Sequence, residues 1–202
     1  KQHQGFTLAT TQAIWPDHPE KVLGCTQAFV DQYPNTARVL VMAILEASRF
    51  IEQNTENRRS TAQLLSSREY LDAPLDCIEP RLLGAYDDGL GNQWQDPHAL
   101  RFFADGEVNL PYLSDGMWFM TQFRRWGLLR EDPDYFGVAR QVQQLQLYSE
   151  AAHSLGIACP GQTMRSSLLI DGSRWDGSDP FGYARSFSLH ALGDLPDARV
   201  GA

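Results

Sequence analysis

Lys21 closes a proline-stiffened turn, which makes it the residue of this chain best placed for binding chemistry. It ends the run His-Pro-Glu-Lys at residues 18–21, and the apolar residues 22–23 predict a strand directly after it. An ammonium group held at such a position can bind a small anion. One charge-assisted hydrogen bond contributes about 1.5–3 kcal/mol, whereas micromolar binding needs about 8 kcal/mol. We therefore expect Lys21 to act together with other donors.

Other polar residues point to weaker chemistry. His18 is best explained as a loop histidine, because no second histidine or carboxylate stands at a metal-ligand spacing. Asp171, Asp176 and Asp179 superficially resemble a calcium loop but lack the ligand order and closing glutamate of an EF-hand. The pair at residues 87–88 forms no acid–base or nucleophile signature. The sequence therefore predicts no catalytic residue, no metal, no cofactor and no enzyme.

The composition argues against two classes of partner. The chain has 202 residues, a net charge of −8 and a pI near 5.0. A protein that binds nucleic acid or an anionic membrane surface usually presents a basic face instead. No stretch approaches the ~18 uninterrupted apolar residues of a membrane span. We expect no direct nucleic-acid partner and no membrane insertion. A local anion site is still compatible with the net charge, because salt screens distant charges over about 8 Å.

The cysteines and the first residues bear on the cellular compartment. Cys25, Cys77 and Cys159 are widely spaced and odd in number, so they fit neither a CxxC metal motif nor a complete disulfide set. We predict buried free thiols, which favour a reducing compartment. The chain opens at Lys1 without a methionine or a signal sequence, so we expect a segment cut from a longer protein, whose start would decide the compartment.

Helix dominates the expected secondary structure. The longest helix is predicted from residue 35 or 36 to about 54, with a core-facing stripe of Leu40, Ile44, Ala47 and Ile51. Pro80 is expected to interrupt or end a helix near residues 75–83. Other helices are expected at residues 60–65, 96–103, 114–127, 135–143, 145–155 and 181–186, a strand at residues 5–11 and a loop at residues 87–92.

Residues 114–127 form the densest aromatic segment, with Ser114 as the expected helix cap and Gly127 as its end. We predict a buried helix here in preference to a partner-binding groove. The side chains that cannot all lie on one side of it are Trp118, Phe119, Gln122 and Trp126. Some of these rings are therefore expected to meet a second lobe or a subunit.

Too few strands are visible to build a complete doubly wound sheet. The pattern instead fits a helix-rich part of an α/β binding protein. No internal repeat, low-complexity tract or linker marks a domain boundary inside the chain. We therefore expect the 202 residues to form one continuous stretch of a larger, two-lobed protein.

Three separated groups of residues carry a resemblance to a known family. They are residues 15–24 with the long helix that follows, residues 96–103 with 110–119 and 125–129, and residues 147–152 with 164–167 and 170–176. In these groups the chain resembles the nitrate- and bicarbonate-binding proteins of bacterial ABC transporters and the nitrate/nitrite sensors related to them. The resemblance covers most of the chain and corresponds to the C-terminal half of such a protein.

The resemblance implies the C-terminal half of a two-lobed, type II periplasmic-binding-protein fold, α/β and helix-rich, with an anion held between the lobes. It makes residues 1–202 a partial substrate-binding-protein-like domain whose N-terminal half is missing. In the family, the lysine of this turn contacts nitrate, so Lys21 is the ligand-binding residue that the resemblance implies. The other contacts belong to the family's earlier sequence. We therefore expect these 202 residues alone to bind nitrate weakly or not at all.

The resemblance leaves several functions open. It implies binding of nitrate or nitrite, either for uptake through an ABC permease or in a sensor that acts on a regulatory protein partner. Residues 115–118 and 165–167 look closer to the soluble sensor branch, which favours a cytoplasmic over a periplasmic location. Bicarbonate, a sulfonate or another small anion stays open, because a lysine does not choose among them. A regulatory module fused to a transporter ATPase also stays open.

Overall fold

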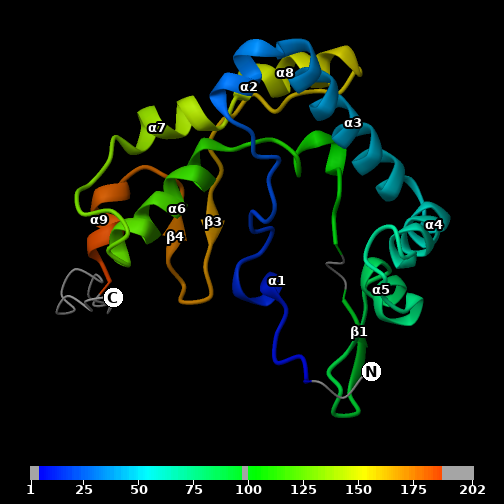
Figure 1. Ribbon diagram of the computed structural model, residues 1–202. Coiled ribbons are helices and arrows are strands. Elements are labelled where there is room, and N and C mark those ends of the chain that lie inside the picture. Colours follow the sequence, from blue (N-terminus) through cyan, green and yellow to red (C-terminus); the bar gives the residue numbers. More distant parts are fainter. Residues whose placement is uncertain (1–4, 97–99, 188–202) are drawn as a thin grey trace, which may run out of the picture. The chain divides into compact units, whose positions relative to one another are not determined.

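Two compact units make up the chain in the computed structural model, which describes residues 5–96 and 100–187 (Figure 1). Unit 1 comprises residues 1–110 and 147–159, and unit 2 comprises residues 111–146 and 160–202. The assignment of the whole chain to one partial domain stays a prediction. In the described parts, no helix combines a length of 18 residues or more with the high hydropathy and low charge of a membrane span.

Unit 1 is built mainly of helices that follow one another along the chain (Figure 1). The longest begins with Pro34 at its first position, where a missing N–H costs no intrahelical bond. Asn54 separates the next two helices, since its side chain accepts a 2.8 Å hydrogen bond from the backbone N–H of Asn57. The helices of this unit are α1 (Thr11–Ile14), α2 (Gln27–Gln32), α3 (Pro34–Gln53), α4 (Thr55–Ser66), α5 (Leu75–Leu82), η1 (Ala104–Gly106) and most of α8 (Leu145–Ser154).

The long helix predicted around residues 35–54 is confirmed as α3, but its predicted core-facing stripe is wrong. Leu40 and Ile44 are each 42% exposed. Periodicity tells which residues share a face, but the neighbouring elements decide which face is covered. Here η1 and the residues after it pack on α3, and the side chain of Asn109 donates a 3.2 Å hydrogen bond to Ser48 Oγ. The residues of α3 that are buried are Ala37, Leu45 and Ser48.

A β-hairpin follows α5 and contains the predicted loop at residues 87–92. Strands β1 (Ala85–Asp87) and β2 (Gln93–Gln95) pair antiparallel, with Tyr86 opposite Trp94 and their rings stacked at 5.6 Å. The Asp88 carboxylate accepts a 2.7 Å hydrogen bond from the backbone N–H of Leu90, which fixes the turn. The loop prediction is confirmed, and it serves as the hairpin connection.

The strands predicted at residues 5–11 and 22–23 are wrong. The N–H of Thr7 donates to the carbonyl of Asp88 in the hairpin at 3.0 Å, and α1 begins at Thr11. Residues 22–23 have no strand assignment. An extended segment becomes a strand only when a second strand pairs with it. Among the described residues, strand pairing occurs only within the two hairpins.

Three other helix predictions in unit 1 need correction. The helix expected at residues 60–65 lies inside α4, which begins earlier because Asn54 caps it. The helix expected near residues 75–83 is confirmed as α5, but Pro80 does not interrupt it. The helix ends two residues later at Leu82, and the N–H of Leu83 donates to the Glu79 carbonyl at 3.1 Å. Residues 100–103 are not helical, because the Glu52 carboxylate takes the backbone N–H groups that a helix would use. Residues 97–99 of that prediction lie outside the described residues.

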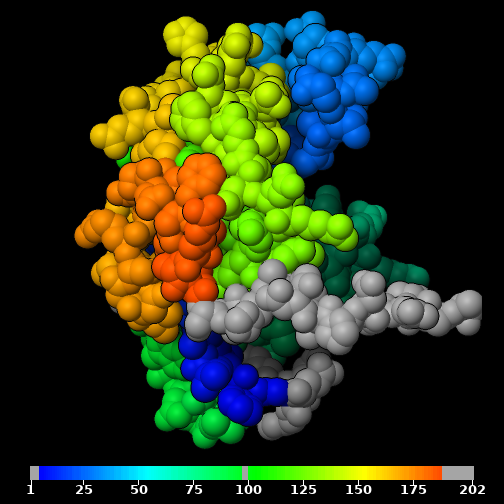
Figure 2. All heavy atoms as spheres, turned by 90° about the vertical axis from the view of Figure 1, so that its left-hand side faces the viewer, coloured from blue at the N-terminus to red at the C-terminus, as the bar shows by residue number. Residues whose placement is uncertain are grey.

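Unit 2 packs three helices and a short hairpin around an apolar core. Its elements are α6 (Leu113–Arg125), α7 (Tyr135–Val142), β3 (Ser167–Leu168), β4 (Arg174–Trp175) and α9 (Pro180–Arg185). In Figure 2, α9 (orange-red) lies at the surface next to the yellow-green α7, and the rings of Tyr135 and Phe181 meet edge to face at 5.2 Å. The core cluster consists of Leu113, Met117, Met120, Tyr135, Ala139 and Trp175. The helices predicted at residues 135–143, 145–155 and 181–186 are confirmed.

The helix predicted at residues 114–127 is confirmed as α6, but it is buried on one face only. Met117 and Met120 are buried, whereas Phe119, Phe123 and Trp126 are 39–46% exposed. Gly127, with φ of 74°, follows the helix as predicted. Ser114 is not the cap, because the helix begins at Leu113.

An ion pair ties the start of α6 to the segment before β3. Arg165 donates to both carboxylate oxygens of Asp115, at 2.9 and 2.8 Å, and its backbone N–H donates to Ser114 Oγ at 3.0 Å. Trp175 Nε1 donates to the Ser114 carbonyl at 2.8 Å. Burial raises the pKa of Asp115, and the hydrogen bond and charge of Arg165 oppose that rise. The sequence pattern gave no sign of this pair.

The three cysteines are free in the structure, but the prediction that they are buried is wrong, since none of them is fully buried. Cys25 and Cys159 are exposed, and Cys77 is half-buried. Cys25 and Cys159 lie outside helices and strands.

Candidate functional site

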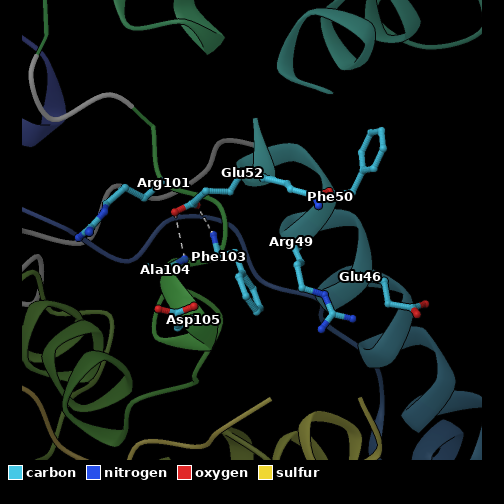
Figure 3. A pocket seen from close by; sticks show the side chains of 9 residues that line it. Glu46, Arg49, Phe50, Glu52, Arg101, Phe103, Ala104 and Asp105 are labelled. Carbon is cyan, nitrogen blue, oxygen red and sulfur yellow. Dashed lines mark hydrogen bonds between the residues drawn. The ribbon is translucent and has the colours of Figure 1, made fainter. Parts of the chain in front are cut away.

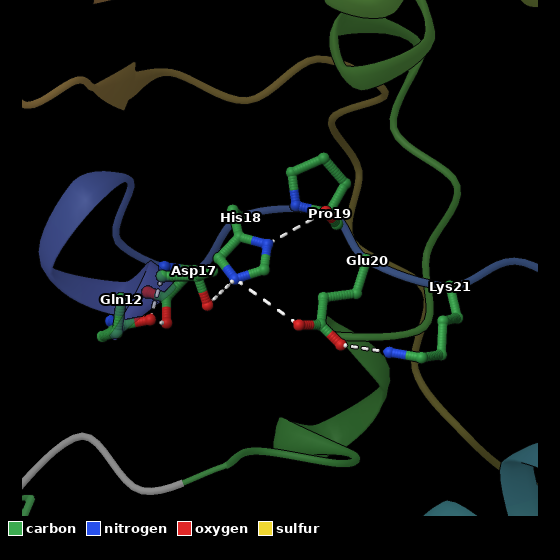
Figure 4. Close-up of polar contacts among 7 residues, drawn as sticks. Gln12, Asp17, His18, Pro19, Glu20 and Lys21 are labelled. Atoms are coloured by element: carbon green, nitrogen blue, oxygen red, sulfur yellow. Dashed lines mark hydrogen bonds and ion pairs between the residues drawn. The ribbon is translucent and has the colours of Figure 1, made fainter. Parts of the chain in front are cut away.

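Lys21 lies on the extended segment between α1 and α2, immediately after the turn that the sequence predicted (Figure 4). Its side chain is 90% exposed, and its Nζ lies 3.0 Å from Oε2 of Glu20. An ammonium group has three donor hydrogens, so this pairing leaves capacity for another acceptor. The structure therefore presents Lys21 as an accessible cation next to a carboxylate.

The turn before Lys21 is fixed by α1. Asp17 has a left-handed backbone, with φ of 54°, which aspartate tolerates better than most residues. Its N–H donates to Gln12 Oε1 at 3.0 Å, and the N–H of His18 donates to the carbonyl of Trp15 at 3.2 Å. Trp15 is only 7% exposed and anchors the turn. These contacts fix the backbone of the turn that precedes Lys21.

His18 is held by its own turn, as the loop interpretation expects. Its Nδ1 lies 3.0 Å from the Pro19 carbonyl, which can only accept, so Nδ1 carries a hydrogen. Its Nε2 lies 2.6 Å from Thr11 Oγ1 and 3.7 Å from Oε1 of Glu20. In the neutral imidazole, Nε2 then accepts from the Thr11 hydroxyl. Thr11 and Glu20, which the sequence analysis did not single out, therefore belong to the surroundings of Lys21.

A hollow of unit 1 lies apart from Lys21 and is lined by other residues. It has a volume of about 720 Å³ and is lined by α3 and the segment leading into η1, with Glu46, Arg49, Glu52, Arg101 and Asp105 as its charged residues (Figure 3). The Glu52 carboxylate accepts backbone N–H bonds of 2.5, 2.5 and 3.1 Å from three successive residues, 102–104. With three carboxylates and two guanidinium groups, the lining favours no anion. Its interactions hold the unit together.

The acidic residues that superficially suggested a calcium loop accept hydrogen bonds from nearby backbone N–H groups instead. Asp171 accepts from the N–H and hydroxyl of Ser173 at 2.9 and 2.7 Å, and these bonds lower the pKa of Asp171. Asp176 accepts from the N–H of Ser178, and Asp179 caps α9 through the N–H of Gly182. Within the described ranges, no group of three His, Cys, Asp or Glu side chains is arranged to hold a metal ion.

Comparison with known proteins identifies the relatives of this chain. A model of the NMT1-like family matches residues 1–66. The nitrate/nitrite binding protein NrtA of Synechocystis sp. PCC 6803 is 32% identical over 95% of the chain and 44% of its own length. The crystal structure of this periplasmic nitrate-binding protein matches 92% of the chain with a TM-score of 0.83, over 49% of the crystallised chain. Over nearly all of its length the chain is therefore similar to part of a nitrate/nitrite binding protein.

Two further relatives are connected with bicarbonate. The bicarbonate-binding protein CmpA of Synechococcus elongatus is 27% identical over 94% of the chain and 44% of its own length. The bicarbonate transport ATP-binding protein CmpC of the same species is 32% identical over 92% of the chain and 27% of its own length. The chain thus spans less than half the length of these relatives.

These matches confirm the family resemblance and the fold class expected from the sequence. The described elements are those of a helix-rich α/β part, about half in length, of a type II periplasmic-binding-protein fold. The family is one of substrate-binding proteins. The role of Lys21 as a ligand-binding residue stays a prediction. The structure adds the accessibility of its Nζ, its pairing with Glu20 and the stiffness of the turn before it.

Proposed function

We propose that the protein containing this chain binds nitrate or nitrite in a cleft between two lobes, and that Lys21 supplies positive charge to the site. The observation that carries the proposal is the 32% identity to a nitrate/nitrite binding protein along nearly the entire chain. The exposed Nζ of Lys21, on a segment fixed by a stiff turn, supports its role. Lobe closure over the ion would bring further donors to the anion.

The same binding step serves either of two biological roles. In uptake, the closed protein docks on an ABC permease, and the relative CmpC is named as an ATP-binding transport protein. In sensing, the anion changes the affinity for a regulatory protein partner, and that coupling is reciprocal. Neither role involves direct contact with nucleic acid, membrane insertion or an enzymatic step. A cytoplasmic location belongs with sensing and a periplasmic one with uptake.

Bicarbonate is the second candidate ligand, and the match to the bicarbonate-binding protein CmpA favours it. Bicarbonate is planar and singly charged like nitrate, so Lys21 suits both ions. A hydroxyl on the ligand distinguishes bicarbonate, because it needs an acceptor in the site where nitrate needs only donors. The match to CmpC keeps a regulatory module fused to a transporter ATPase as a further alternative.

Isothermal calorimetry of the full-length protein with nitrate, nitrite and bicarbonate tests the proposal. We expect tight binding of nitrate or nitrite and weaker binding of bicarbonate. Tight binding of bicarbonate alone would establish the second candidate. No binding of any of the three would refute the proposed function while leaving the family and the fold intact.

A further inference from the structure

Glu20 is the acidic group nearest to Lys21, and any anion that binds Lys21 must meet it. Its Oε2 lies 3.0 Å from Lys21 Nζ, and its side chain is 47% exposed (Figure 4). An anion in hydrogen-bond contact with Nζ would place its charge within about 4–6 Å of this carboxylate. Like charges at such a distance repel even in water. The Glu20 carboxylate therefore competes with a bound anion for the Lys21 ammonium group.

The position of Glu20 is limited by the turn that also positions Lys21. Pro19 directly precedes Glu20, and its ring fixes its own backbone angle φ. On the other side of the carboxylate, Oε1 lies 3.7 Å from Nε2 of His18, whose ring is in turn held by Thr11 and the Pro19 carbonyl. Glu20 thus lies between two potential cationic partners, and only the Lys21 ammonium is within hydrogen-bond distance.

We propose that Glu20 is a specificity-determining residue that lowers the affinity of the site for anions in general and restricts it to singly charged ones. The inference rests on the proposed anion-binding function of Lys21. With the carboxylate in place, the pair carries no net charge, so a second negative charge on the ligand gains nothing from Lys21. The substrate class is then a small, singly charged anion that binds through hydrogen bonds, and a dianion such as sulfate is rejected.

The Glu20→Gln variant of the full-length protein tests this inference, with calorimetric titrations of nitrate and sulfate. Removing one charge about 4 Å from the ligand in a watery environment should tighten nitrate binding about fivefold and sulfate binding about twenty-five-fold. The ratio of the two affinities is the decisive readout, because a loss of structure would weaken both. Glu56→Gln is the matched control, since Glu56 is an exposed α4 carboxylate that lies 3.9 Å from Arg59, and it removes the same charge elsewhere.

The outcomes separate this inference from the proposed function. If Lys21→Ala weakens nitrate binding and Glu20→Gln tightens both anions, sulfate more, the inference holds. If Lys21→Ala weakens binding but Glu20→Gln leaves the nitrate-to-sulfate ratio unchanged or mirrors Glu56→Gln, Glu20 is a surface residue and the inference is overturned. If Lys21→Ala has no effect, the proposed site itself is wrong, whatever Glu20 does.

Discussion

The longest helix of each unit makes an instructive pair. α3 in unit 1 has 20 residues and buries three of them, Ala37, Leu45 and Ser48. α6 in unit 2 has only 13 residues and buries seven, four of which are polar or charged. The more apolar and longer helix is therefore the less covered one. Neighbouring elements, and not the length or apolar content of a helix, decide how much of it is buried.

The difference extends from the helices to the units. Unit 2 encloses an apolar cluster and satisfies its buried Asp115 with Arg165. Unit 1 leaves Leu8 and Val22 90% and 83% exposed in its extended segments, next to the exposed Lys21. Stability is thus expected to depend mainly on unit 2, and the proposed binding chemistry on unit 1. The predictions below test this division.

The largest stability loss is expected from Trp175→Ala in unit 2. The ring is 2% exposed, belongs to the core cluster and donates to the Ser114 carbonyl. Removing a buried tryptophan costs about 3–5 kcal/mol. Trp94→Ala in the hairpin of unit 1, where the ring is 39% exposed, is the matched control and should cost far less. Urea unfolding measures both, and equal losses would contradict the division.

Arg165→Met is expected to cost about 3 kcal/mol at pH 7, because it leaves the buried Asp115 without its cation. The pKa of Asp115 is already raised by burial, and losing Arg165 raises it further. A folded-state pKa above the unfolded value means that the folded protein binds more protons, so stability increases as pH falls. The deficit of the variant should shrink between pH 7 and the ordinary carboxyl range. A deficit that does not change with pH would argue against a buried carboxylate.

Glu52→Ala tests whether a polar group stabilises unit 1 as apolar packing stabilises unit 2. Its carboxylate accepts the N–H groups of Phe102, Phe103 and Ala104. Losing these acceptors should cost about 2 kcal/mol, since N–H groups would be left unpaired. Hydrogen exchange at these three amides should accelerate in the variant, while the amides of α6 keep their protection. Unaltered exchange at residues 102–104 would show that the carboxylate is dispensable.

The smallest effect is expected from Ile44→Ser on the exposed face of α3. The side chain is 42% exposed, so the substitution should lower the free energy of unfolding by less than about 1 kcal/mol. Leu45→Ser, one position further, is the matched control, because Leu45 is 1% exposed. Thermal melts of the two variants should differ clearly. A drop in melting temperature for Ile44→Ser as large as that for Leu45→Ser would mean that the predicted stripe faces the core after all.

Sequence patterns predicted features that depend on local backbone chemistry, such as the end of a helix. They failed for features that depend on contacts with distant parts of the chain, such as strand pairing. Gly127 ends α6 as expected, because a left-handed residue there needs no partner elsewhere in the chain. The strand at residues 5–11 failed, since a strand needs a second strand that the sequence cannot identify. The stripe of α3 failed for the same reason, because Leu40 and Ile44 show the right spacing but are not covered.

The candidate site was only partly predictable. The turn chemistry around Pro19 marked Lys21 as a cation on a defined segment, and the family resemblance gave it a ligand role. The pairing with Glu20 could not be predicted, because adjacent side chains of an extended chain normally point to opposite sides. Arg165 and Asp115 were likewise missed, since 49 residues separate them in the sequence and no spacing rule links them.

Nitrate calorimetry of the full-length protein and its Lys21→Ala variant tests the central claim most directly. We predict that the variant binds nitrate about 1.5–3 kcal/mol more weakly, which is the contribution of one charge-assisted hydrogen bond, with an unchanged melting temperature. Arg68→Ala, which removes an exposed positive charge in the turn after α4, should bind like the parent. An unchanged dissociation constant for Lys21→Ala would remove Lys21 from the site.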